Sequence, residues 1–334
     1  MGLKVAVVGA TGVVGSKMLS ILEERSFPAE EVKALASAKS VGKRLLYKGR
    51  EIVVELARPE AFEGVNIALF SAGGELSKEL APEAAKRGCV VIDNSSAWRM
   101  DPDVPLVVPE VNENDVFKNK GIIANPNCST AQLVLVLWPL HKRYGLKRVV
   151  VSTYQAVSGA GKKGIDDLNN QIDAIVNGKE IVCKKFPYQI AFNCIPHIDV
   201  FKENGYTKEE MKVIEESRKI MHIDNLAITC TAVRVPVLNS HSESVNVELE
   251  KEFDLDEVRD LFSKSPGIKL YDDYTKNVYP MPIIATNKDE TFVGRIRRDF
   301  SVKNGLNLWV VSDNLRKGAA LNAVQIAESL INKK

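Results

Sequence analysis

The sequence predicts an α/β fold made of two domains, and three observations carry this prediction. The chain opens with an apolar strand, residues 4–8, followed at once by spaced glycines and a helix through Leu22. Apolar strands at residues 66–70 and 89–92 flank a helical segment and end in polar or glycine residues, as the strands of ligand-binding parallel sheets do. The length of 334 residues suits two domains of roughly 150 residues each.

Composition excludes several classes of function. With 45% apolar and 26% charged residues, the chain resembles ordinary globular proteins. A net charge of +2 gives no field suited to nucleic acid or to a membrane surface. The longest apolar run, residues 131–140, is too short to span a bilayer. Because the N-terminus enters a strand directly, we expect no signal peptide.

The cysteines predict free thiols rather than disulfides or a metal site. Five cysteines, an odd number, are scattered along the chain, which suits a reducing cytoplasm. Cys194 and His197 are spaced like zinc ligands, with Cys183 upstream, but no paired Cys-x-x-Cys accompanies them. We therefore expect a cytoplasmic protein without a metal ion.

The first turn of the chain predicts a dinucleotide site. Gly9, Gly12 and Gly15 recur every third residue between the first strand and the first helix. In a dinucleotide fingerprint, such glycines allow a tight turn, a close approach of the backbone to the pyrophosphate, and contact between helix and strand. A plain βα turn is the alternative, but the position at the start of the fold favours cofactor binding.

The tip of the second strand favours NADP over NAD. This strand, residues 32–37, ends with Ser37 and is followed by Ala38, Lys39 and Ser40. An NAD site would usually carry an acidic residue there to bind the ribose 2′-hydroxyl. Two hydroxyls and a cation suit a 2′-phosphate instead. Alternatively, Lys39 is an exposed loop lysine with no ligand.

Further polar strand tips should face the cofactor. Ser71 and Gly73 follow one strand, and Asn94 and Ser95 follow the next. Arg99 lies in the loop beyond them, where its guanidinium could bind a phosphate or carboxylate. The alternative for Arg99 is a surface ion pair with Asp101 or Asp103.

Cys128 is the candidate nucleophile. It lies where an apolar strand, residues 122–124, passes through Asn125-Pro126-Asn127 into a long apolar helix that ends near Gly145. The backbone N–H groups and the positive dipole end of a helix start favour the thiolate. The alternative is a small buried core cysteine, which the polar neighbours argue against.

The second half of the chain predicts a second sheet with helices. The β-rich segment 147–154 leads into a loop from Gln155 to Gly161, which we expect to converge on the site. Thr207 begins a helix with a capping-box pattern. Glu209 and Lys212 lie one turn apart on it, and the sequence alone favours a helix-surface pair.

Among the four histidines, His241 is the best partner for Cys128. It lies in a hydroxyl-rich loop that we expect between strands 228–237 and 245–249. The segment 280–298 predicts turns and a basic surface. A last strand, 306–311, precedes an amphipathic helix, 319–331, which could pack on the first domain and bring Asn314 near the nicotinamide.

Taken together, five motifs resemble the bacterial type of aspartate-β-semialdehyde dehydrogenase over nearly the whole chain. The motifs are Gly9-x-x-Gly12-x-x-Gly15, Asn125-Pro-Asn-Cys128-Ser-Thr, Gln155-x-x-Ser158-Gly, Arg234-Val-Pro-Val-x-x-Ser-His241 and Asp313-Asn-Leu-Arg-Lys-Gly-Ala-Ala. The resemblance implies an NADP-binding Rossmann domain of residues 1–127 and 313–334. It also implies a central α+β catalytic and dimerisation domain of residues 128–312, like that of glyceraldehyde-phosphate dehydrogenase, in a homodimer or dimer of dimers.

The resemblance also implies roles for individual residues. Cys128 would form an acyl thioester, His241 would act as acid–base, Gln155 would orient the substrate, and Arg234 would bind its carboxylate. Arg99, Asn127 and Lys212 match phosphate-binding positions, and Glu209 would meet the substrate amino group. The expected cofactor contacts are Gly9, Thr11, Gly12, Val13, Val14, Gly15, Ser37, Lys39, Ser40, Ser71, Gly73, Asn94, Ser95, Ser158, Gly159 and Asn314.

The implied reaction is the NADPH-dependent conversion of 4-phospho-L-aspartate to L-aspartate 4-semialdehyde, with release of phosphate. It belongs to lysine, methionine, threonine and diaminopimelate biosynthesis. N-acetyl-γ-glutamyl-phosphate reductase performs similar chemistry, but its Gly-Cys-Tyr-Pro motif differs from Asn-Cys-Ser-Thr here. Glyceraldehyde-phosphate dehydrogenase-like enzymes carry Cys-Thr-Thr after Ser and differ too. A silent NADP-binding sensor, in which Cys128 is no more reactive than a free thiol, is the alternative outside enzymes.

Overall fold

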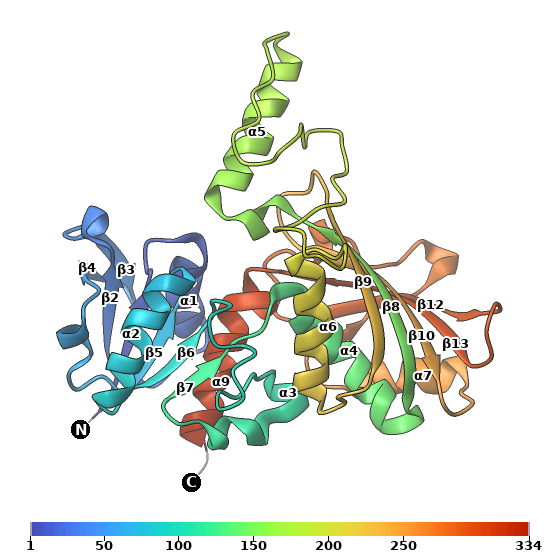
Figure 1. Ribbon diagram of the computed structural model, residues 1–334, viewed down its shortest axis with the longest axis horizontal. Helices are drawn as coiled ribbons and strands as arrows, with labels where there is room; N and C mark the ends of the chain where they lie inside the picture. The colour runs from blue at the N-terminus through green and yellow to red at the C-terminus, as the bar shows by residue number, and fades with distance from the viewer. Residues whose placement is uncertain (1, 333–334) are drawn as a thin grey trace. The chain divides into compact units, whose positions relative to one another are not determined.

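The computed structural model describes residues 2–332, which fold as two compact units. The first unit contains the chain up to Asn127 together with the segment from Ala319 onward, and the second contains residues 128–318 (Figure 1). Residues 313–318 therefore pack with the second unit and not with the first, where the resemblance had placed them. Asp313 explains this, because its carboxylate accepts a 2.7 Å hydrogen bond from the Asn287 amide in the second unit.

The first unit is built on a seven-stranded sheet of order β3-β4-β2-β1-β5-β6-β7. Its strands are β1 (Leu3–Val8), β2 (Ala29–Ala36), β3 (Arg44–Tyr47), β4 (Arg50–Leu56), β5 (Ile67–Phe70), β6 (Val90–Asp93) and β7 (Ile122–Ala124). All neighbouring strands are parallel except β3 and β4. Helices α1 (Val13–Glu24) and α2 (Gly74–Lys86) connect parallel strands, as the predicted Rossmann arrangement requires.

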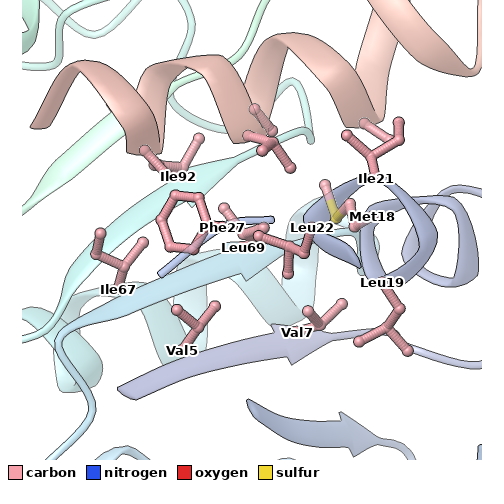
Figure 2. Packing of buried hydrophobic residues seen from close by; sticks show 14 of the residues in the cluster. Val5, Val7, Met18, Leu19, Ile21, Leu22, Phe27, Ile67, Leu69 and Ile92 are labelled. Atoms are coloured by element: carbon pink, nitrogen blue, oxygen red, sulfur yellow. The ribbon is translucent and has the colours of Figure 1, made fainter. Parts of the chain in front are cut away.

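Alternate side chains of β1 belong to two hydrophobic cores, one on each face of this sheet. Val5 and Val7 pack with α1 and with α9 (Leu321–Asn332), the helix that returns near the end of the chain (Figure 2). Ala6 and Val8 pack with α2 on the other face. This period of two, with apolar side chains on both faces, is typical of a strand buried in a parallel sheet. The short helix α3 (Pro109–Asn112) also contacts α9.

The second unit is built on a six-stranded mixed sheet of order β11-β12-β13-β10-β8-β9. Its strands are β8 (Leu146–Gln155), β9 (Ala227–Arg234), β10 (His241–Leu249), β11 (Ile268–Leu270), β12 (Thr291–Asp299) and β13 (Gly305–Ser312). Its helices are α4 (Cys128–Tyr144), α5 (Lys162–Val176), α6 (Lys208–Met221), α7 (Leu255–Lys264) and α8 (Pro282–Ala285). Helix α4 packs across β8, β10 and β13, α6 packs on α4 and β9, and α5 extends away from the sheet (Figure 1).

The local patterns in this unit are confirmed at α6 and corrected at β10 and β12. Thr207 and Glu210 form the predicted capping box, with both reciprocal hydrogen bonds present. His241 was expected in a loop, which is wrong: it is the first residue of β10 and pairs with Ser312. Residues 291–299, expected as turns, form β12, with Arg295 at a break in its pairing with β13.

Candidate active site

In the first unit, the glycine loop lies at the carboxyl edge of the sheet. Gly9 has φ of +80°, and a Cβ there would lie 2.3 Å from the Ser71 carbonyl oxygen. A Cβ on Gly15 would lie 2.1 Å from the Gly9 carbonyl oxygen. Only glycine fits these two positions, so the loop can lie close against β5 and α1. Gly12 caps α1 without a side-chain hydrogen bond, so backbone N–H groups at the helix start suit a phosphate.

The tip of β2 meets this loop. The Thr11 hydroxyl donates to Ser40 Oγ at 3.2 Å, which joins the glycine loop to the segment after β2. Ser37 and Lys39 are exposed, and Ser40 is buried. An exposed Lys39 is compatible both with a 2′-phosphate ligand and with a plain loop lysine.

The tip of β6 carries an amide that has no partner among residues 2–332. Asn94 Oδ1 and Nδ2 are both shielded from solvent and make no hydrogen bond within that range. Next to it, Asp93 is fully buried and accepts from Ser95 Oγ at 2.5 Å. Burial raises the pKa of Asp93, and hydrogen bonds offset part of that rise. A buried amide without a partner is the feature expected where a polar ligand binds.

Arg99 is held by the backbone of the same sheet edge. Its Nε donates to the Asn125 carbonyl at 2.9 Å, and its Nη2 donates to the Asn94 carbonyl at 2.7 Å. The side chain is buried, so Arg99 does not occupy the exposed surface position considered from the sequence. Asn127, the last residue of the unit, is buried as well.

In the second unit, Cys128 is the first residue of α4 and is partly exposed. Cys89 and Cys230 provide the contrast. Both are buried, and burial raises the pKa of each thiol, to about 12 for Cys89. Cys128 therefore does not fit the core-cysteine alternative. Gly318 lies against it, since a Cβ on Gly318 would be 2.8 Å from the Cys128 Cβ.

His241 and Arg234 approach one another beside Gly159. A Cβ on Gly159 would lie 3.0 Å from Arg234 Nη1 and 3.1 Å from His241 Nε2. Arg234 Nη1 donates to the Ala156 carbonyl at 2.7 Å. The guanidinium also interacts electrostatically with Cys128 and Glu209, which both act to raise its pKa against the larger effect of burial. The candidate nucleophile Cys128 and the side chains of His241 and Arg234 thus share one neighbourhood.

The hydrogen bonds of His241 define its protonation state. Its Nδ1 accepts from the Ala156 amide at 3.0 Å, which assigns the proton of the neutral ring to Nε2. Nε2 has no hydrogen-bond partner among residues 2–332. Burial, assisted by the charge of Arg234, lowers the pKa of His241 to about 3. The ring is therefore a neutral N–H donor near neutral pH.

Asn314 fixes the backbone immediately before His241. Its Oδ1 accepts from the Ser240 amide at 2.9 Å and from Ser158 Oγ at 3.2 Å, and its Nδ2 donates to Ser158 Oγ at 3.0 Å. Ser240 has φ of +73°, a left-handed conformation that a serine adopts only when its surroundings hold it. The predicted cofactor contacts Ser158 and Asn314 therefore also shape the loop that leads into His241.

A second network joins three predicted substrate residues. Gln155 Nε2 donates to Glu209 Oε1 at 3.1 Å, and Lys212 Nζ pairs with Glu209 Oε2 at 3.0 Å and Asp199 Oδ2 at 2.9 Å. The pair of Glu209 and Lys212 favoured by the sequence is therefore present, but it is not at the surface, because Glu209 is only 6% exposed. The Gln155 amide contacts β8 as well, since Thr153 Oγ1 donates to its Oε1 at 3.1 Å.

Comparisons with known proteins match this architecture. The family model described as "Semialdehyde dehydrogenase, NAD binding domain" matches residues 4–119, and "Semialdehyde dehydrogenase, dimerisation domain" matches residues 137–317. Aspartate-semialdehyde dehydrogenase of Aquifex aeolicus is 59% identical, covering 100% of this chain and 99% of that protein. The enzyme of Bacillus subtilis is 55% identical, covering 98% and 97%. The chain belongs to the aspartate-semialdehyde dehydrogenase family.

A solved structure of the family has the same fold. Aspartate semialdehyde dehydrogenase II from Vibrio cholerae, complexed with ASA, superposes with a TM-score of 0.97 at 48% identity, covering 100% of this chain and 99% of that one. The predicted Rossmann domain and second α/β domain are confirmed. As an aspartate-semialdehyde dehydrogenase family member, the chain is an oxidoreductase that uses a dinucleotide, and the dimerisation domain supports an oligomer.

Two other kinds of feature, a membrane-spanning helix and a metal-binding cluster, are absent from residues 2–332. Between residues 2 and 332, no helix has the length and apolar character needed to cross a membrane. Within the same part of the chain, no cluster of three or more histidine, cysteine, aspartate or glutamate side chains is arranged to hold a metal ion.

Two site features of this family member were missed from the sequence, Gly318 and the Ser240 turn. Gly318 was noted only as the start of the last helix, although the Asp313-to-Ala320 motif contains it. Its spatial closeness to Cys128 spans 190 positions of sequence, and no local pattern reports such a contact. For Ser240, the adjacent Asn239 and Ser240 do indicate a turn, which is a usable signal for a left-handed residue.

Gly318→Ala tests the contact with the nucleophile. The added Cβ would meet the Cys128 Cβ at 2.8 Å, and because that atom is anchored to the backbone, the start of α4 must shift. We expect kcat to fall by roughly 10- to 100-fold, since sub-ångström misplacement of a reacting group is costly. Gly74→Ala is the matched control, because its Cβ would make only an ordinary 3.9 Å contact. Equal activity of the two variants in steady-state assays would show that α4 tolerates the shift.

The depressed pKa of His241 predicts an acid-sensitive stability. The ring has an ordinary pKa of 6.5 when unfolded and about 3 when folded, so the unfolded state binds more protons between these values. The stabilisation is present above about pH 6.5 and is lost as the pH falls towards 3. Relative to His241→Asn, the wild type should lose about 2 to 3 kcal/mol of unfolding free energy between about pH 7 and pH 4.5. Urea unfolding of both proteins at each pH measures this difference. If the free energy of unfolding changes equally with pH in the two proteins, the prediction is wrong.

Proposed function

We propose that this protein catalyses the NADPH-dependent reductive dephosphorylation of 4-phospho-L-aspartate to L-aspartate 4-semialdehyde through a thioester on Cys128. The observation that carries the proposal is the shared neighbourhood of Cys128, Arg234 and His241, with an Nε2–H donor that has no partner among the described residues. The family membership and the relatives' names give the substrate class.

The start of α4 and Arg234 activate the nucleophile. The helix dipole and the guanidinium both favour a negative charge on Sγ. The thiolate attacks C4 of the acyl phosphate, and the C4–O bond to phosphate breaks, which leaves a thioester and free phosphate. After reduction, the thiohemiacetal collapses with cleavage of its C–S bond. The His241 Nε2–H group donates a hydrogen bond that stabilises the oxyanion and the departing sulfur, and the collapse returns Cys128 as a thiolate.

The dinucleotide fits the first unit. The glycine loop, the uncapped start of α1 and the Asn94 amide supply backbone and side-chain donors at one sheet edge. NADPH, when bound, supplies the hydride that reduces the thioester. We assign Ser37, Lys39 and Ser40 to binding the 2′-phosphate on the adenosine ribose of NADP.

The substrate groups follow from the charges in the second unit. Arg234 offers a fixed guanidinium for the α-carboxylate, and Glu209 offers a carboxylate for the amino group. Gln155, bonded to Glu209, orients the acyl group. Lys212 is the cation of this unit assigned to the phosphate. Arg99 and Asn127 match phosphate-binding positions of the family, and both side chains are buried.

This reaction would place the protein in the cytoplasm, in the biosynthesis of lysine, methionine, threonine and diaminopimelate. We propose a homodimer or a dimer of dimers, supported by the match to a dimerisation domain.

The decisive experiment follows NADP reduction with L-aspartate 4-semialdehyde in the presence and absence of phosphate. Turnover that requires phosphate supports both the substrate and the phosphorylating reaction. No turnover in a folded, NADP-binding protein would reject the proposal. N-acetylglutamate 5-semialdehyde, the substrate of the related reductase, serves as the specificity control.

The strand tip after β2 predicts a preference for NADP. Wild type should show a kcat/KM for NADP at least about tenfold above that for NAD, because a 2′-phosphate gains charge-assisted hydrogen bonds. Lys39→Ala should reduce that ratio mainly through KM for NADP. Lys43→Ala, another exposed lysine shortly after this tip, is the control. A wild-type preference for NAD would overturn the assignment.

A further inference from the structure

Glu243 is a fully buried carboxyl group directly beneath the candidate catalytic residues. It lies two residues after His241 on β10, so both side chains point to the same face of the sheet. The register places Glu243 opposite Thr153 on β8 and Val310 on β13. Thr153, in turn, donates to the Gln155 amide. Glu243 therefore belongs to the row of side chains that supports His241 and Gln155.

Gln132 of α4 is the polar side chain that faces Glu243. It lies one helical turn after Cys128, and its side chain lowers the pKa of the Glu243 carboxyl group against the larger, opposite effect of burial. Its Nε2 points instead to the His241 carbonyl, at 3.4 Å. Both Glu243 oxygens and Gln132 Oε1 are buried and have no hydrogen-bond partner among residues 2–332.

Each of these three oxygen atoms is an acceptor that lacks a hydrogen-bond donor within the described part of the chain. An ionised carboxylate and an amide oxygen are both acceptors, so neither can satisfy the other. One proton on Glu243 removes the conflict, because a carboxylic acid donates as well as accepts. Burial raises the pKa of Glu243 well above its usual value, which agrees with a neutral acid. Cys230, which interacts electrostatically with Glu243 and is buried too, offers no compensating positive charge.

We propose that Glu243 is a neutral carboxylic acid that donates to Gln132 Oε1 and thereby positions His241. The donated hydrogen bond would fix the Gln132 amide with Nε2 towards the His241 carbonyl, and so fix the backbone from which the imidazole projects. Glu243 does not touch the reacting atoms; it is a positioning residue. The inference rests on the proposed role of His241 for its effect on turnover, but not for the protonation state of Glu243.

Three variants separate a neutral acid from an ionised one. Glu243→Gln keeps a donor and an acceptor in the same shape, so kcat should stay within about threefold of wild type. Glu243→Leu and Gln132→Leu remove the bond and should each lower kcat by roughly 10- to 100-fold with KM nearly unchanged. Combining the two leucine substitutions should cost no more than either alone. Glu248→Gln, on the same strand and paired with Lys147 at the surface, is the control.

A spectroscopic measurement on the resting protein decides the protonation state without turnover. The infrared spectrum of the wild type at neutral pH should contain the carbonyl stretch of a protonated Glu243. The difference between the wild-type and Glu243→Gln spectra should therefore show this band, because the variant lacks it. The ¹⁵N signals of His241 should shift in Glu243→Leu and not in Glu243→Gln. If Glu243→Gln is as impaired as Glu243→Leu, or if the band is missing in wild type, the carboxylate is ionised and the proposal fails. Because both spectra are independent of catalysis, they stand even if the proposed function is rejected.

Discussion

Replacing Cys128 by serine is expected to lower kcat by at least about 10³-fold, because removal of a nucleophile eliminates the covalent route. A serine hydroxyl has the same shape at the start of α4, so Gly318 still fits against it. What is lost is the ionised sulfur, since the helix dipole and Arg234 cannot ionise an alcohol to a useful extent near neutral pH. Steady-state NADP reduction with L-aspartate 4-semialdehyde and phosphate measures the loss.

Cys194→Ser provides the control for this experiment. Cys194 is an exposed thiol in the same unit and should be replaceable without effect on kcat. Alkylation by iodoacetamide as a function of pH adds an independent measurement, in which Cys128 should react at a lower pH than Cys194. A Cys128→Ser enzyme that keeps a tenth of the wild-type rate would remove the thioester from the mechanism. A Cys128 no more reactive than Cys194 would favour the silent sensor.

His241→Asn is expected to lower kcat by roughly 10²- to 10³-fold, the loss that follows removal of one hydrogen-bond donor to a developing oxyanion. An asparagine oxygen can accept the Ala156 N–H bond that His241 Nδ1 now accepts, so the local backbone should be preserved. The asparagine places no N–H donor at the Nε2 position, so the charge that develops on the substrate loses this hydrogen bond. KM for the semialdehyde should change little, because Arg234 keeps its bond to the Ala156 carbonyl.

Measurements before the steady state can distinguish the proposed role of His241 in turnover from a purely structural role. If the His241 N–H stabilises charge that develops after the thiolate has reacted, His241→Asn should still form the covalent adduct with the substrate while later turnover is slow. Mass spectrometry of the trapped enzyme detects that adduct. A variant with near-wild-type kcat, or one that has lost the near-ultraviolet signature of the fold, would contradict the assigned role.

Elements with local signals could be predicted from the sequence. The strand–glycine–helix opening depends on three glycines within seven residues, and the start of α6 depends on Thr207 and Glu210 in contact. In both cases, the residues that determine the structure are neighbours in sequence. The burial of α4 also follows from its apolar composition, with its start at Cys128 set by the Asn-Pro-Asn turn.

The hairpin of β3 and β4 could not be predicted with the same rules. Its two-residue turn consists of Lys48 and Gly49, both with positive φ, as a type I′ turn requires. Lysine at the first of these positions is a weak signal compared with asparagine or aspartate. His241 was misplaced for a related reason: polar residues at 240–244 hide the start of β10, since His241 and Glu243 occupy buried positions that usually carry apolar residues.

Sequence patterns are thus least able to predict the burial and the partners of the residues in the candidate site. From the sequence alone, Arg99, Glu209 and Lys212 could each form an ion pair at the surface. The burial of Arg99 and Glu209 contradicts a surface position for these two residues. Their burial depends on backbone carbonyls and side chains far away in sequence, such as Asn125 for Arg99 and Gln155 for Glu209. Local composition contains no information on those partners, so only the three-dimensional structure, or a family resemblance, could assign them.

The return of α9 to the first unit has a consequence for biosynthesis on the ribosome. Ala320, Val324 and Ile326 lie in the same core as β1 and α1, although nearly the whole chain separates them in sequence. The core on this face of the first sheet therefore cannot be completed before residues 321–332 have been translated. Chaperones that shield apolar surface are expected to act on nascent chains that lack α9.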